Sequence, residues 1–156
     1  MTRDFHLNSR SNSIGSFIYF ASTIVRNVLS AKTVGLIHDG LDLKSWLIKN
    51  GLRTTFEFSN NQLRNSEITF NQSQKADCIV AFNPFDDFTQ EEFERSIELF
   101  TKFDCAMILA VQSVEHNLTM PASLRTTLEW HEILEKYGRV IEVYRHSCYN
   151  LFLVMK

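Results

Sequence analysis

The sequence predicts an α/β protein with three layers, in which helices cover both faces of a mostly parallel sheet and a C-terminal antiparallel β-hairpin ends the chain. Two patterns support this fold class. Short apolar runs alternate with stretches in which apolar residues recur every three or four positions, as buried strands and amphipathic helices do. The last two β-rich runs, 140–144 and 149–155, are separated only by a polar turn, which indicates the hairpin.

The clearest stretch is 76–112, where a strand, a loop, a helix and a second strand follow one another. The apolar run 77–82 is typical of a strand covered on both faces. A second such run, 105–111, follows the helix, so the two strands are expected to pair in parallel. Most of the thirteen phenylalanines fall on core spacings and do not predict an aromatic binding surface. The buried side of the helix is expected to carry Phe93, Ile97 and Phe100, with Phe103 closing it.

The residues at the start of that helix predict where it begins. Thr89 and Glu92 have the spacing of a capping box, in which each side chain accepts a hydrogen bond from the backbone of the other. Phe88 and Phe93 occupy the two positions of a hydrophobic staple. In open α/β folds the loop after a strand binds ligands, so 83–88 is the first place to look for function.

The chain before this unit begins with a helix expected from Ser13. Its apolar stripe either covers the sheet or, over residues 14–30, contacts a second copy of the chain as a homo-oligomer. The stripe consists of Phe17, Phe20, Ala21, Ile24, Val25 and Val28.

Two strands are expected next, at 33–37 and 54–58, on either side of a helix that ends at Gly51. The polar segment 59–66 predicts a turn, and 67–70 one more short strand. The apolar face of the helix is Leu43, Trp46 and Leu47.

After the central unit, 113–123 predicts a loop. Thr126 and Glu129 then repeat the capping-box spacing at the start of another helix, which is expected to stop at Gly138. The apolar stripe of this helix is Trp130, Ile133, Leu134 and Tyr137.

Composition favours a single domain over 13–156, preceded by a polar arm at 1–12. The formal net charge of −2 gives no basic excess, so nucleic acid is not an expected partner. No stretch has the length and hydropathy of a membrane span, and the three cysteines fall on predicted strands, as reduced core thiols do. We therefore expect a cytoplasmic protein with no membrane partner, and no Cys/His pattern predicts a metal site.

The order of elements from 33 to 156 resembles that of the class I S-adenosylmethionine-dependent methyltransferases. These Rossmann-like folds alternate strands and helices and finish with a hairpin whose last strand is antiparallel to the rest. The resemblance is strongest in 77–111 and 129–143. It implies S-adenosylmethionine as cofactor and transfer of its methyl group to an acceptor that the sequence does not identify.

The resemblance also implies where the cofactor would lie. The family's first strand ends in a glycine-rich turn, which corresponds here to His38, Asp39 and Gly40, a degenerate version with one glycine. Glu57 follows Gly40 by seventeen residues, near the spacing of about twenty at which such folds place an acid on the ribose hydroxyls. Asn71 stands near the expected polar contact to adenine. A half-exposed edge strand would also carry a residue such as Glu57.

On the acceptor side, Asn83-Pro84-Phe85 is similar to the Asn-Pro-Pro-aromatic loop of amino-methyltransferases. In that loop the asparagine accepts a hydrogen bond from the target amino group and the aromatic ring stacks on the flat acceptor. An ordinary Asn-Pro turn followed by a core phenylalanine would give the same three residues. His116, in the expected loop after the second central strand, is a candidate general base, although a solvated histidine fits that position too.

Two other functions remain open from the sequence. The degenerate turn and the short segment between 59 and 75 fit a protein that keeps the fold, lacks catalysis and serves as a binding or assembly module. A protein that cleaves the cofactor instead of transferring its methyl group is the third candidate.

Overall fold

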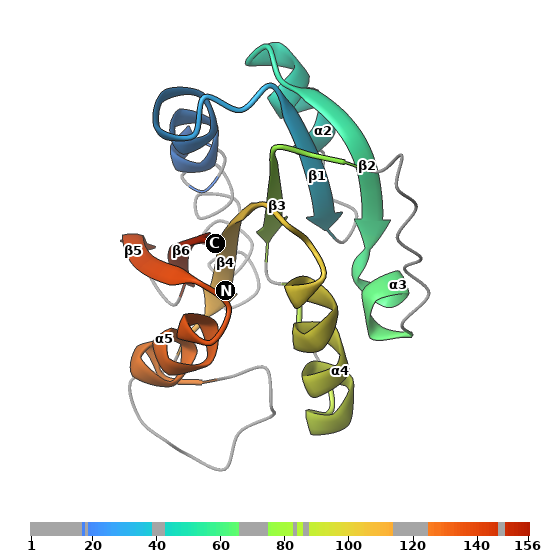
Figure 1. Ribbon diagram of the computed structural model, residues 1–156, viewed down its shortest axis with the longest axis vertical. Coiled ribbons are helices and arrows are strands. Elements are labelled where there is room, and N and C mark those ends of the chain that lie inside the picture. Colours follow the sequence, from blue (N-terminus) through green and yellow to red (C-terminus); the bar gives the residue numbers. More distant parts are fainter. Residues whose placement is uncertain are drawn as a thin grey trace, which may run out of the picture.

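The computed structural model describes residues 17, 19–38, 43–65, 75–82, 84–85, 88–113, 125–146 and 149–156. Over these residues six strands form one sheet in the order β2-β1-β3-β4-β6-β5, with helices packed on its two faces (Figure 1). The strands are β1 (Thr33–His38), β2 (Arg53–Ser59), β3 (Cys78–Phe82), β4 (Ala106–Gln112), β5 (Arg139–His146) and β6 (Tyr149–Met155).

The sheet is parallel except for its last strand. Strand β1 lies between β2 and β3 and is parallel to both, and β3 is parallel to β4. Strand β6 enters between β4 and β5 and is antiparallel to each. The predicted fold class is therefore confirmed, including the C-terminal antiparallel hairpin. The helices are the π-helix η1 (Ile24–Val28), α2 (Leu43–Lys49), α3 (Asn60–Arg64), α4 (Gln90–Thr101) and α5 (Thr127–Glu135).

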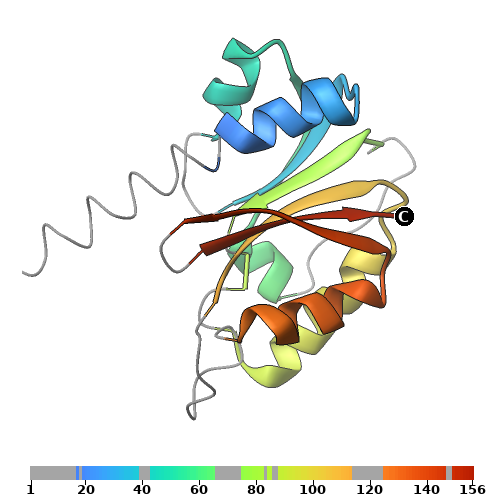
Figure 2. The same cartoon turned by 90° about the vertical axis from the view of Figure 1, so that its left-hand side faces the viewer.

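Helices cover both faces of the sheet, as Figure 2 shows from the side. The first helix, helical from Phe17 and ending in η1, lies with α2 on one face, and α4 and α5 lie on the other. Each face has its own core, because every residue of β3 is buried and successive strand residues point to opposite sides. Ile79 and Ala81 join the core under α4 and α5, whereas Cys78 and Val80 join the core under the first helix.

The first helix covers the sheet, which was one of the two alternatives that its apolar stripe allowed. Phe17 and Ile24 are 4% and 5% exposed and belong to the core of this face. Tyr19, at 65% exposed, lies outside the stripe. The stripe is one residue shorter than predicted, because Val28 is 61% exposed at the end of η1, where the chain turns through Ser30 toward β1.

The helix start predicted at Thr89 is confirmed. The Glu92 N–H donates to Thr89 Oγ1 at 3.2 Å, and the Thr89 N–H donates to Glu92 Oε2 at 2.9 Å. Phe88 and Phe93, the predicted staple, are both buried and both pack edge-on against the ring of Phe85. The two staple residues are therefore linked through the ring of Phe85.

One predicted element was wrong. The segment 59–66, expected as a turn, contains the helix α3, whose Ser59 N-cap forms a reciprocal capping box with Gln62. The helix is only five residues long and buries a single apolar side chain, Leu63, so the sequence has no apolar period to reveal it. The strand expected at 67–70 and the loop from 114 onward lie outside the described residues.

Candidate functional site

The candidate site is the edge at which the parallel strands β1, β2 and β3 end. His38 is the last residue of β1 and pairs with Ser59, the last residue of β2. Phe82 ends β3, the neighbouring strand on the other side of β1. The connections that follow these strands leave from one edge of the sheet, which is where ligands bind in open α/β folds.

Only part of the predicted site falls within the described residues. The backbone of His38 is described as the end of β1, whereas its side chain is not. Glu57 and Phe85 are described in full. The other predicted site residues lie outside the described part of the chain: Asp39, Gly40, Asn71, Asn83 and His116.

Glu57 points to the face of the sheet that carries α2. It pairs with Leu36, which is fully buried in the core under the first helix and α2. The residues on either side, Phe56 and Phe58, belong to the opposite core, under α4. This alternation places the Glu57 carboxylate beside α2, the helix that follows the predicted cofactor turn.

An ion pair with Lys44 engages the Glu57 carboxylate at the surface. Lys44 Nζ lies 3.7 Å from Glu57 Oε2, and the two side chains are 55% and 37% exposed. An ion pair this open contributes at most about 1 kcal/mol, because water screens it. The carboxylate therefore remains partly exposed to water in spite of its ion pair with Lys44. Carboxylate oxygens accept hydrogen bonds from hydroxyl groups, so the side chain is chemically compatible with the ribose contact expected of it, and that contact stays a prediction.

Phe85, in the connection after β3, packs its ring into the core. Its ring is 1% exposed and stacks on Trp130 with centroids 5.8 Å apart and an interplanar angle of 18°. The Trp130 indole Nε1–H in turn donates to the carbonyl of Gln112 at 3.0 Å, which ties α5 to the end of β4. Phe85 thus occupies the core position that the sequence offered as an alternative, and its stacking on an acceptor stays a prediction.

Beside this loop, α3 is joined to α4 by polar contacts that the sequence did not reveal. Arg64 lies over the ring of Phe88, 4.9 Å from its centroid, and its Nε is 3.6 Å from Glu92 Oε2. The Ser96 hydroxyl of α4 lies 3.4 Å from the Leu63 carbonyl of α3 and donates within its own helix to the Glu92 carbonyl at 2.7 Å. Since Glu92 also caps α4, one carboxylate connects the helix start to α3. The capping-box spacing of Ser59 and Gln62 was the only sequence signal for this arrangement.

The described cysteines are unsuited to nucleophilic chemistry. Burial raises the pKa of the Cys78 thiol to about 12 and that of the Cys105 thiol to about 11. Both are free thiols, Cys78 buried in the core and Cys105 partly buried against it, so they stay protonated and inert. Nor do the described residues bring three metal-ligating side chains together anywhere.

Comparison with solved structures identifies the architecture. The methyltransferase domain of bacterial CtHen1 superposes with a TM-score of 0.62 at 12% identity, covering 89% of this chain and 97% of that one. The chain has the class I S-adenosylmethionine-dependent methyltransferase fold. No family model and no curated protein sequence matches the chain.

Two further solved structures superpose over most of this chain. TehB from Haemophilus influenzae gives a TM-score of 0.53 at 11% identity, covering 87% of this chain and 61% of that protein. The phosphoethanolamine N-methyltransferase 2 of Haemonchus contortus, solved with phosphomonomethylethanolamine and S-adenosylhomocysteine, gives 0.52 at 12% identity, covering 88% and 36%. At these identities the likeness establishes the fold, and the activity has to be argued from the site.

No helix among the described residues has the length and apolar character needed to cross a membrane.

Proposed function

We propose that the protein binds S-adenosylmethionine and transfers its methyl group to an acceptor still to be identified. The observation that carries this proposal is the position of Glu57. On a sheet of methyltransferase topology, this accessible carboxylate lies near the carboxyl end of β2, on the α2 face and next to β1. That is the position at which a fold of this kind requires an acid for the ribose.

The cofactor would be held by groups at the ends of β1 and β2. The backbone that leaves β1 at His38, with Asp39 and Gly40, would approach the amino-acid part of the cofactor, since a glycine there lets the main chain come close. Glu57 would accept hydrogen bonds from the ribose hydroxyls, and Asn71 would contact the adenine. When bound, the cofactor supplies an electrophilic methyl group on a sulfonium.

The acceptor would enter over the loop after β3. Asn83 would accept a hydrogen bond from the acceptor and orient it in line with the methyl group, which is chiefly a positioning effect. Phe85, the residue two positions further on, is buried in the core and stacked on Trp130, so its part is to position the connection after β3. His116 is the proposed base for an acceptor that must lose a proton. The proposal includes a cytoplasmic location.

Isothermal titration of the whole protein with S-adenosylmethionine and S-adenosylhomocysteine tests the cofactor claim. Saturable heat is expected for both, and Glu57→Gln is expected to weaken binding about tenfold to a hundredfold, the loss of a charged hydrogen-bond acceptor. Glu132→Gln, which removes an exposed carboxylate from α5, is the matched control and should leave the Kd unchanged. Absence of heat with both ligands would refute the proposal.

A catalytically inactive assembly module is the alternative with a specific structural requirement. Any homo-oligomer formed through residues 14–30 would have to use exposed side chains such as Tyr19 and Val28, because Phe17 and Ile24 are buried on the sheet of their own chain. Light scattering on Tyr19→Glu and Val28→Glu variants tests this. Product analysis after incubation with S-adenosylmethionine alone distinguishes a cofactor-cleaving enzyme from both.

A further inference from the structure

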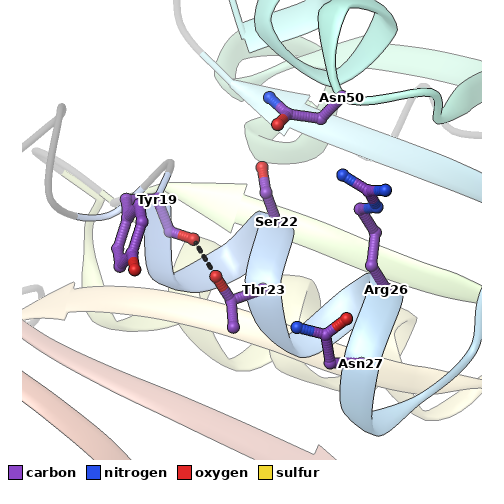
Figure 3. A pocket seen from close by; sticks show the side chains of 6 residues that line it. All are labelled: Tyr19, Ser22, Thr23, Arg26, Asn27 and Asn50. Atoms are coloured by element: carbon purple, nitrogen blue, oxygen red, sulfur yellow. Dashed lines mark hydrogen bonds between the residues drawn. The ribbon is translucent and has the colours of Figure 1, made fainter.

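A polar pocket lies between the first helix and the end of α2, away from the candidate methyltransferase site. Its volume is about 230 Å³. On the α2 side it is bounded by Asn50, which stands three residues before β2 begins, whereas the candidate site is reached where β2 ends. The seven residues of β2 span about 20 Å. The pocket is lined by Tyr19, Ser22, Thr23, Arg26, Asn27 and Asn50 (Figure 3).

The helical wall of the pocket is a polar stripe. Its five residues recur at the i, i+3, i+4, i+7 and i+8 spacing of a single helix face. Such a stripe normally faces water, yet Ser22 within it is 5% exposed. The stripe continues into the π-helical turn η1, whose wider winding is closed by the Leu29 N–H on the Ile24 carbonyl at 2.9 Å. Single π-turns are frequent at functional sites.

Ser22 is the strongest sign that something binds there. Its buried Oγ has no hydrogen-bond partner, which costs free energy unless a ligand or water supplies one. Figure 3 shows this hydroxyl directed from the helix toward Asn50, across the pocket. Thr23 differs, because its hydroxyl already donates to the Tyr19 carbonyl at 2.9 Å. Ser22 is therefore a buried donor held in the pocket without a structural bond of its own.

The charge of the pocket lining indicates which class of ligand it would bind. Arg26 extends its guanidinium toward the same side of the pocket as Ser22 and Asn50. Within the described part of the chain, no carboxylate lies within ion-pair distance of Arg26, and none of the six lining residues is acidic. A guanidinium presents paired N–H donors that match the oxygens of a carboxylate or a phosphate. The lining thus combines a positive charge with hydroxyl and amide groups.

We propose that this pocket binds a small anion through its carboxylate or phosphate group, with Arg26 supplying the charge and Ser22 donating a hydrogen bond. The site is independent of the proposed methyltransferase function and would stand if that function failed. The two anion classes share the recognition chemistry, and the experiment separates them.

The test is a titration of the isotopically labelled whole protein with inorganic phosphate and, separately, with acetate, followed by NMR. Sodium chloride at equal ionic strength corrects for screening. We expect saturable shifts of the Asn27 and Asn50 side-chain amide signals with at least one of the two anions, with a Kd of about 1 mM. Saturation by phosphate alone or by acetate alone identifies the class. No saturation by either anion at about 20 mM would overturn the proposal.

Two variants and a control test which residues form the anion site. Arg26→Gln should weaken the anion at least about tenfold, because it removes the positive charge of the lining. Ser22→Ala should also weaken it while leaving the thermal unfolding midpoint unchanged or raised, since it deletes an unsatisfied buried hydroxyl. Lys49→Gln removes one exposed positive charge next to Asn50 but outside the lining, so binding should persist. Equal weakening by Arg26→Gln and Lys49→Gln would show a diffuse charge effect and refute the site.

Discussion

The substitution Gly35→Ala tests what holds β1 and β2 together. Gly35 pairs with Phe56, whose ring lies directly over it. A β-carbon on Gly35 would lie 2.1 Å, 2.3 Å and 2.7 Å from three ring atoms of Phe56, whereas carbons in contact stay about 3.5–4.0 Å apart. The ring cannot yield easily, because it packs 5.3 Å from Phe58 and is stacked 5.7 Å from Phe103 at 11°.

The expected cost follows from this geometry. Overpacking a core typically lowers the free energy of unfolding by about 1–3 kcal/mol. Because Gly35→Ala creates three clashes with one ring, we expect a loss of about 3 kcal/mol. Phe56→Ala should cost about 3–5 kcal/mol, because the ring is 7% exposed and leaves a cavity. In the double variant the added methyl enters the space that the ring has left. Its stability should therefore match that of Phe56→Ala alone, a coupling of about 3 kcal/mol.

Urea unfolding followed by far-UV circular dichroism gives the four free energies of unfolding for this cycle. Gly51→Ala is the matched control: Gly51 has φ 77°, and a β-carbon added to it would meet nothing within 4 Å, so an alanine there is strained without touching Phe56. It should cost about 1 kcal/mol and add to Phe56→Ala. If Gly35→Ala and Phe56→Ala also add within about 0.5 kcal/mol, the contact does not limit the packing of the two strands.

Three further predictions concern single interactions. Two backbone N–H groups at the start of β1 donate to Asp77 and hold the pKa of its carboxyl below the usual 3.8. The stabilisation is therefore complete at neutral pH and lost as pH falls through that lowered pKa. Because water screens this exposed carboxylate, Asp77→Ala should cost only about 1 kcal/mol at pH 7 in urea titrations, and much less near pH 2. Thr89→Ala should cost about 1 kcal/mol by losing one bond of the α4 cap, and adding Glu92→Ala should cost about 1 kcal/mol more, because it removes the bond from the Thr89 N–H and the Arg64 ion pair. Trp130→Phe removes the bond to the Gln112 carbonyl and should lower the free energy of unfolding by about 2 kcal/mol, whereas a loss under about 0.5 kcal/mol would mean that this bond is dispensable.

The sequence predicted those elements in which local signals and burial agree. The helix from Thr89 has a cap, a staple and an apolar stripe, and each of them appears in the structure. The short helix α3 has the same cap spacing at Ser59 and Gln62 but buries only Leu63, so its residues resembled a turn. A helix held mainly by its cap and one side chain has no period that a sequence can display.

The polar pocket could not be predicted for a different reason. Polar residues at helical spacing, such as Ser22 and Arg26, are what a solvent-exposed helix face carries. They become the wall of a pocket only because the turn at Asn50 packs opposite them, and that contact joins parts of the chain separated by a whole strand. For Glu57, the residue spacing predicted the position along the chain but not the face of the sheet to which the side chain points.

The face of Glu57 is decided by the register between β1 and β2. The pairing skips Thr55: Val34 pairs with Thr54, and Gly35 with Phe56. Without that bulge Glu57 would pair with Ile37 and point into the core under α4, because successive strand residues alternate between faces.

Only a glycine at position 35 leaves room for the Phe56 ring, so the same contact that holds the two strands also selects the bulged register. A Gly35→Ala protein that still folds should therefore bind S-adenosylmethionine at least about tenfold more weakly, although residue 35 lies in the sheet and not at its edge. The double variant Gly35→Ala/Phe56→Ala, freed of the clash, should recover part of that affinity. An unchanged Kd in a destabilised Gly35→Ala protein would show that the orientation of Glu57 does not depend on this contact.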